Sequence, residues 1–228
     1  MTKSFRVLFL SVFFIAACSN DNGGDDGGGE TPDKTFDRGA MLANWADNII
    51  IPAFEDFKSS TTALNQSAIQ FIEEPTEGNL GDLRNAYLDA YLKFQNVSMF
   101  EIGKAETLSY RINLNTYPTD GPGMISHIEE GDYNLELPSS FDEQGFPALD
   151  FLLYGLAETD GEIVAIYSTS ENAALYKDYL GEVAIKIDDL TKAVLDDWKG
   201  GFRDAFVGNT SSSNTGSVDK LANDYIFY

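Results

Sequence analysis

Apolar residues recur at steps of three and four positions over a long stretch near the start of this chain. The positions on this apolar face are Leu42, Trp45, Ile49, Ala53, Phe57, Leu64, Ala68 and Phe71. The spacing predicts one long amphipathic helix, from about Asp37 to a residue before Pro75. Pro52 falls inside this helix and lacks a backbone donor, so we expect a kink there. A helix of this kind must bury its apolar face against other helices.

The same periodicity returns farther along the chain, and strand-like alternation is scarce. Further helices are predicted from an Asn79 cap toward Gly103, from about 170 to 199, from Pro147 to Gly155, and after a Ser217 cap. We therefore predict an all-α fold, a bundle of long up-and-down helices. The segment at about 104–144 loses its periodicity and is dense in turn residues, so we expect it to be irregular. Long segments of this kind are often functional.

The first residues have the form of a bacterial lipoprotein signal peptide, predicted to span 1–17. Lys3 and Arg6 precede an apolar run, and Ile15-Ala16-Ala17-Cys18 has the form of a lipobox. The run is shorter than the roughly 20 residues that a membrane-spanning helix needs. We therefore expect cleavage before Cys18, the only cysteine of the chain, and a lipid on its thiol. The alternative is a structural cysteine behind an ordinary signal peptide.

Residues 18–34 are rich in Asp, Asn and Gly and form a predicted flexible tether to a helical domain at 35–228. This order predicts a protein anchored in the bacterial cell envelope, at the outer membrane, on its periplasmic or surface face. The membrane is then a partner through the lipid on Cys18.

The formal net charge of −22 limits the classes of partner. It repels phosphate backbones, so we expect no nucleic-acid binding. It attracts cations and cationic partners, although an acidic surface that only keeps the protein soluble gives the same charge.

Candidate chemistry rests on carboxylates, because the single histidine and single cysteine exclude the usual zinc ligand sets. Hard cations take several oxygens from separate segments, so Asp47, Asp120 and Asp150 are the candidate metal ligands if they converge. The alternative for Asp150 is a carboxylate favoured by the positive end of a helix. His127 is expected to be exposed, in a loop or a short helix.

Three segments, in this order, resemble the imelysin-like family: Asn44–Pro52, Asn115–Asp120 and Gly145–Gly155. The resemblance covers roughly 35–228. It implies a helical envelope protein, with two packed bundles at full length, and a link to bacterial iron uptake. Iron or another hard cation is the ligand that it implies, and an iron-uptake protein is the implied protein partner.

The family carries a Gly-x-His-x-x-Glu motif at its proposed site, and it is named for a peptidase. Gly145 matches, but Pro147 stands at the histidine position and Asp150 at the glutamate position. Proline offers neither a lone pair nor a proton, so a two-residue metal or acid–base role is reduced to one carboxylate. Full-length members continue past Tyr228, so the resemblance also implies that the helical domain is incomplete.

We therefore expect an envelope lipoprotein that binds without catalysis, as a component of iron or metal uptake. One alternative is a hydrolase of the metallopeptidase type. Another is a scaffold or adhesion lipoprotein, which an exposed aromatic patch without converging acids would favour. The positions of Asp47, Asp120, His127 and Asp150 in space distinguish these hypotheses.

Overall fold

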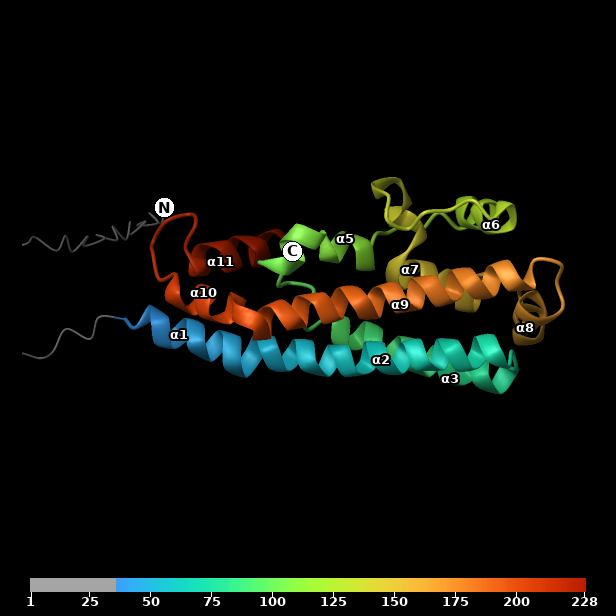
Figure 1. Cartoon of the computed structure of the whole chain (residues 1–228), viewed down its shortest axis with the longest axis horizontal. Helices are drawn as coiled ribbons and strands as arrows, with labels where there is room; N and C mark the ends of the chain where they lie inside the picture. Colours follow the sequence, from blue (N-terminus) through green and yellow to red (C-terminus); the bar gives the residue numbers. More distant parts are fainter. Residues whose placement is uncertain (1–35) are drawn as a thin grey trace, which may run out of the picture. The chain divides into compact units, whose positions relative to one another are not determined.

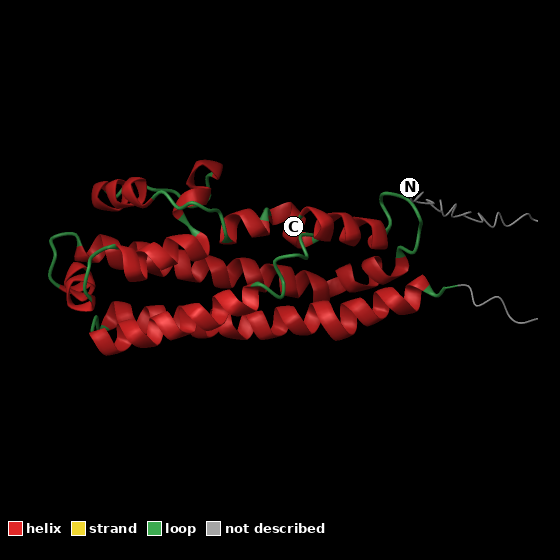
Figure 2. Ribbon diagram, turned by 180° about the vertical axis from the view of Figure 1, so that it is seen from behind, coloured by secondary structure: helices red, strands yellow, loops and turns green. Residues whose placement is uncertain are grey.

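The computed structural model describes residues 36–228, and every regular element there is a helix (Figures 1 and 2). The all-α prediction is confirmed for this part of the chain. The predicted signal peptide, Cys18 and the tether at 18–34 lie outside the described residues. None of the described helices is both long and apolar enough to cross a membrane.

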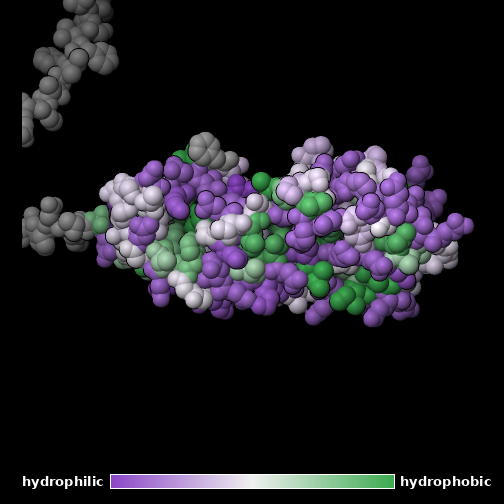
Figure 3. Space-filling view, turned by 45° about the horizontal axis from the view of Figure 1, so that its top comes forward, coloured by the Kyte–Doolittle hydropathy of each residue, from purple (hydrophilic) through white to green (hydrophobic). Residues whose placement is uncertain are grey.

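Three long helices form the body of the fold: α2 (Ile51–Glu73), α3 (Glu77–Phe94) and α9 (Ala173–Asp197). α2 packs along both α3 and α9. In Figures 1 and 2, α5, α6 and α11 lie on the side of α9 away from α2 and α3. The apolar face predicted for the first helix is buried at Phe57, Leu64 and Phe71. Figure 3 shows that one face of the molecule is mostly hydrophilic, with hydrophobic residues in separate patches.

The remaining elements are short. They are α1 (Arg38–Trp45), α4 (Lys104–Leu108), α5 (Tyr110–Leu114), α6 (Gly121–Glu130), a 3-10 helix (Pro138–Glu143), α7 (Gly145–Asp150), α8 (Asp160–Ser168), α10 (Arg203–Gly208) and α11 (Ser217–Phe227), with π turns at Ala46–Ile50, Phe151–Gly155 and Trp198–Phe202. The segment at 104–144 contains only short helices joined by loops, which agrees with the expected loss of periodicity there. Helices this short contain too few turns to show a period in sequence.

The predicted first helix begins where expected, because the Asp37 side chain accepts the Ala40 N–H at 2.9 Å. The expected kink takes the form of a π turn between α1 and α2. In this turn the Ile51 N–H bonds to the carbonyl of Ala46, five residues back. Pro52 follows directly, in the first turn of α2, where its missing donor leaves no regular α-helical bond unmade.

Three predicted helix ends are wrong. Thr76, not Asn79, caps α3: its hydroxyl oxygen accepts the Asn79 N–H at 3.2 Å. The same helix ends at Phe94, and Gly103 instead precedes α4 with a positive φ. Gly216 precedes α11, because the Ser217 hydroxyl donates to the carbonyl of Phe206.

A polar cluster fixes how α2 and α9 meet. The Asp188 carboxylate of α9 accepts hydrogen bonds from Lys58 Nζ at 2.8 Å and from Thr61 Oγ1 at 2.7 Å, both on α2. Farther along α9, the Thr191 hydroxyl lies 2.9 Å from the hydroxyl of Tyr110 on α5, so a second bond joins α9 to that short helix. Such bonds are made in only one alignment of the helices, so they select a register that apolar packing alone leaves open.

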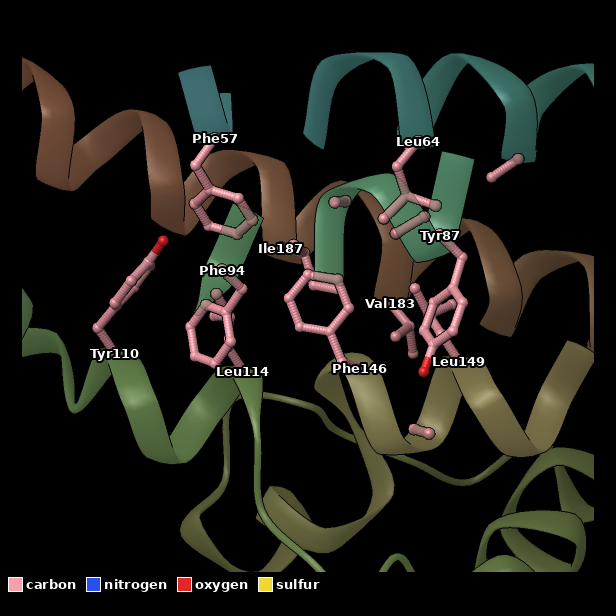
Figure 4. Close-up of a cluster of buried hydrophobic side chains, with 14 of the residues drawn as sticks. Phe57, Leu64, Tyr87, Phe94, Tyr110, Leu114, Phe146, Leu149, Val183 and Ile187 are labelled. Carbon is pink, nitrogen blue, oxygen red and sulfur yellow. The ribbon is translucent and has the colours of Figure 1, made fainter. Parts of the chain in front are cut away.

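Phe146 of α7 is inserted between α2 and α3 (Figure 4). Its ring centroid lies 5.1 Å from that of Tyr91, 5.4 Å from Phe94, 6.1 Å from Tyr87 and 6.2 Å from Phe57. Aromatic pairs at these separations stabilise a core beyond their buried area. Phe146 therefore holds α7 against the two longer helices.

Glycine at position 145 makes this insertion possible. Gly145 has φ +74, and a Cβ there would overlap the carbonyl oxygen of Leu114. Only glycine takes this backbone conformation at such a close approach without strain. The glycine that the family motif shares is therefore a packing requirement of this fold.

We predict that Gly145→Ala destabilises the chain by about 1–3 kcal/mol through backbone strain alone, with the clash adding to it. Gly81→Ala is the control, because Gly81 lies inside α3 with no packing neighbour within 4 Å of the place that a Cβ would take. It should instead stabilise by about 0.5–1 kcal/mol. Urea unfolding followed by circular dichroism measures both, and equal effects of the two variants would contradict the role given to Gly145.

Candidate functional site

Two of the three family-like segments meet at a cleft of about 440 Å³. Its lining includes Tyr87, Tyr91, Asn115, Tyr117, Asp150 and Tyr154. Pro147 lines it as well. The motif positions 147 and 150 thus line the cleft together, and residues from two other parts of the chain supply about half of its wall.

Tyr87 and Tyr91 form the α3 side of the cleft. They are one helical turn apart, and their rings stack at 5.9 Å with an interplanar angle of 14°. Both rings also contact Phe146. The Tyr91 hydroxyl lies 3.5 Å from Asn115 Oδ1, which connects α3 to the second family-like segment.

Tyr154 lies in the π turn that follows α7, and Arg84 of α3 holds this turn. Arg84 Nε and Nη2 donate to the carbonyl of Leu153 at 3.0 and 2.7 Å. The same guanidinium lies 4.4 Å from the centroid of the Tyr154 ring. Asp160 pairs with Arg84 Nη1 at 2.8 Å and neutralises it.

Asp150 is the one acidic residue among those that line the cleft. It is exposed, and no described residue forms an ion pair with it. Burial, and then the charge of Asp150, raise the pKa of Tyr87. Burial and Asp150 also raise the pKa of Tyr154, against the lowering effect of Arg84. The carboxylate therefore acts on tyrosines from both walls of the cleft.

The alternative reading of Asp150 as a helix-dipole residue does not fit its position. The positive end of a helix acts on its first turn, and Asp150 is the last residue of α7, beyond that turn.

The structure does not bring Asp47, Asp120 and Asp150 together as metal ligands. Between residues 36 and 228, no three His, Cys, Asp or Glu side chains are grouped to hold a metal ion. Asp47 pairs with Arg203 at 2.6 Å, and the hydrogen bond from Arg203 holds the pKa of Asp47 below its usual range. Asp120 caps α6, where its side chain accepts the Gly123 N–H at 3.0 Å. Asp47 is therefore engaged in an ion pair, Asp120 caps a helix, and Asp150 lines the cleft.

His127 lies on the short helix α6 with its side chain 46% exposed, as expected from sequence. The sequence did not indicate its partner: Nδ1–H donates to Glu143 Oε2 at 2.9 Å. Glu143 is buried, and its backbone carbonyl accepts the Tyr179 hydroxyl at 2.6 Å. No local pattern links residues from two separate short helices, so only the folded structure shows this pair.

The first family-like segment lies away from the Asp150 cleft. Its residues Trp45, Ile49 and Ile50 line an apolar groove of about 310 Å³ together with Leu221 and Tyr225 of α11. This part of the resemblance therefore marks a second surface.

We predict that the pKa of His127 lies above 6.5 in the folded chain, because the hydrogen bond to Glu143 and its charge favour the imidazolium. The pair then stabilises the fold at pH below the unfolded pKa, and the effect is lost as pH rises through the folded pKa. Glu143→Gln should lower the pKa, and Glu130→Gln, which removes a lesser contributor, should lower it less. A proton NMR titration follows the single histidine directly. Equal pKa values in all three chains would contradict this role of Glu143.

Comparisons with known proteins agree with this architecture. The family model described as Imelysin, peptidase M75, matches residues 50–226. Iron-regulated protein A of Synechococcus elongatus is 22% identical over 117 residues, which cover 51% of this chain and 32% of the relative.

Two solved structures share the fold at 18% identity. One is a putative iron-regulated protein A precursor from Parabacteroides distasonis, with a TM-score of 0.64 over 82% of this chain and 54% of that one. The other is an imelysin-like protein from Psychrobacter arcticum, with a TM-score of 0.66 over 83% and 58%. The chain thus spans between about a third and three fifths of the length of these relatives. The predicted family resemblance is confirmed by a match over residues 50–226, which includes the second and third motif segments and only the end of the first, and the chain belongs to the imelysin family.

Proposed function

We propose that this chain is an envelope-anchored binding component of bacterial iron acquisition, without catalytic activity, and that the Asp150 cleft is its binding site. The observation that carries the proposal is the meeting of two family-like segments at one tyrosine-lined cleft. Relatives named as iron-regulated support the link to iron. The lipobox that ends at Cys18 supports the anchoring.

The residues of the cleft favour binding over hydrolysis. General acid–base catalysis needs a group that gives or takes a proton near neutral pH. Pro147 cannot do so, and Asp150 has no second carboxylate or histidine beside it in the cleft. The raised pKa values of Tyr87 and Tyr154 keep both phenols protonated, so neither acts as a base.

A cleft of this kind suits an iron complex or a partner group better than a bare metal ion. Hard cations take several oxygen ligands at once. Asp150 supplies one carboxylate, and the neighbouring protonated phenols are poor ligands. The volume of about 440 Å³ is also large for a single ion.

We predict that deleting this chain in the bacterium that encodes it slows growth when iron is limiting but not when iron is plentiful. The wild-type chain should restore growth, whereas Asp150→Ala should restore it poorly because the cleft loses its charge. Glu73→Ala is the matched control and should behave as the wild type, because Glu73 is an exposed carboxylate outside the cleft that forms no ion pair with a described residue. Growth rates over a series of iron concentrations provide the measurement. A deletion strain that grows normally at every iron level would disprove the iron link.

We also predict that Cys18→Ser abolishes lipid attachment, because serine offers no thiol to the lipid. Labelling with radioactive palmitate and membrane fractionation measure this. The wild-type chain should carry label and sediment with membranes, and the variant should do neither. A labelled Cys18→Ser chain would refute the anchor.

A scaffold role is a second candidate, favoured by the apolar groove around Trp45 and by the absence of a metal-ligand group between residues 36 and 228. Ile49 and Tyr225 are both exposed on this groove. The growth assay separates the two functions. If the chain is a scaffold, the double variant Ile49→Ser/Tyr225→Ser should fail to restore growth of the deletion strain, whereas Asp150→Ala should restore it.

A further inference from the structure

We propose that the Asp150 cleft binds an organic cation, with an alkylated ammonium group held among tyrosine rings beside the carboxylate. The inference rests on the proposed function only in taking this cleft as the binding site. The link to iron can fail without affecting it.

Four of the residues that line the cleft are tyrosines, which is the composition of an aromatic cage. Tyr87 and Tyr91 come from α3, Tyr117 from the loop after α5, and Tyr154 from the π turn after α7. Tyr117 is 85% exposed and Tyr154 is 45% exposed, so both rings present open surface. Tyrosine faces attract ammonium groups and also pack against their methyl groups. Rings gathered from three segments can therefore surround one such group.

The charge of the cleft selects a cation. None of its lining residues is basic, and Asp150 has no ion-pair partner among the described residues. An anion would be repelled by this uncompensated carboxylate, and a neutral ligand would leave its charge unpaired. An ammonium group supplies the missing opposite charge.

The protein itself places a cation on one of these rings. The Arg84 guanidinium lies 4.4 Å from the centroid of Tyr154. Arg84 does not line the cleft, and Asp160 pairs with it at 2.8 Å, so it does not neutralise Asp150. The Tyr154 ring thus already makes one cation–π contact, with Arg84. The cleft that Tyr154 lines contains no cationic side chain.

A metal ion fits this cleft less well than an organic cation. Metal binding by phenols requires their deprotonation, which burial and the Asp150 charge oppose at Tyr87. A cation–π contact instead uses the neutral ring, and the methyl groups of an alkylated ammonium replace water at the apolar walls. The same chemistry occurs in small molecules such as choline and in methylated lysine side chains.

Isothermal titration calorimetry on the full chain tests the proposal. Choline should bind about tenfold more tightly than 3,3-dimethylbutan-1-ol, which has the same shape without the charge. A short peptide with trimethyl-lysine forms the second arm: tighter binding than choline indicates a side chain as the source, and weaker binding a free small molecule. Equal binding of choline and the neutral alcohol, or no binding of either cation, would overturn the proposal.

Matched variants locate the site. Asp150→Asn and Tyr117→Leu should each weaken choline binding at least about fivefold, whereas Tyr117→Phe, which keeps the ring, should retain it. Glu73→Gln and Tyr225→Leu remove an exposed carboxylate and an exposed tyrosine outside the cleft and should leave choline affinity unchanged. Thermal unfolding checks that every variant is folded. Choline affinity that is indifferent to both Asp150→Asn and Tyr117→Leu would refute the cage.

The outcome is separate from that of the iron experiment. If neither cation binds but Asp150→Ala still fails to restore growth at low iron, the cage is wrong and the proposed function stands. If choline binds and the deletion strain shows no iron phenotype, the cage stands and the iron link fails.

Discussion

The insertion of Phe146 between α2 and α3 is the contact on which the rest of the structure depends. Its ring meets Phe57, Tyr87, Tyr91 and Phe94, and the positive φ of Gly145 lets the backbone come close enough for this. Tyr87 and Tyr91 also line the Asp150 cleft. The core and the site therefore share side chains, and α7 cannot shift without moving Asp150 relative to the tyrosines. Rigid support of this kind is what a preorganised binding site requires.

The π turns connect the family-like segments to this frame. Each π turn adds one residue to a helical turn and changes which side chains face the core. The turn after α7 carries Tyr154 into the cleft, and Arg84 bonds its Leu153 carbonyl. The turn before α2 places Asp47 beside Arg203. Arg203 is the first residue after the π turn that follows α9. Two of the three family-like segments thus contain a π turn. One places Tyr154 at the cleft, and the other places Asp47 in its ion pair with Arg203.

The sequence predicted the parts of the fold that depend on local spacing. The apolar period of α2 and α9, the start of the first helix near Asp37 and the end at Gly155 of the helix predicted from Pro147 follow from neighbouring residues, and all are confirmed, although that last helix begins at Gly145. The site was predictable only through the resemblance, which singled out Asp150. Tyr154 follows Asp150 by four residues, but Tyr87 and Tyr91 lie on α3 and Tyr117 on a separate loop, so no local spacing joins these three to Asp150. The pairs Asp47–Arg203 and His127–Glu143 escaped sequence reasoning for the same reason.

Pro147 shows how the family motif changes character in this chain. Position 147 is the third residue of α7, where the N–H has no partner inside the helix, so proline costs little there. The replacement removes the imidazole of the motif while leaving the backbone intact. Asp150 then remains as the one carboxylate of the cleft, and the raised pKa values of Tyr87 and Tyr154 keep these two phenols protonated. A ligand that covers this carboxylate must compensate for its lost hydration, and a cation also supplies the opposite charge. Proline at position 147 thus leaves a single carboxylate among tyrosines in the cleft, and the proposed binding of a cation rests on this arrangement.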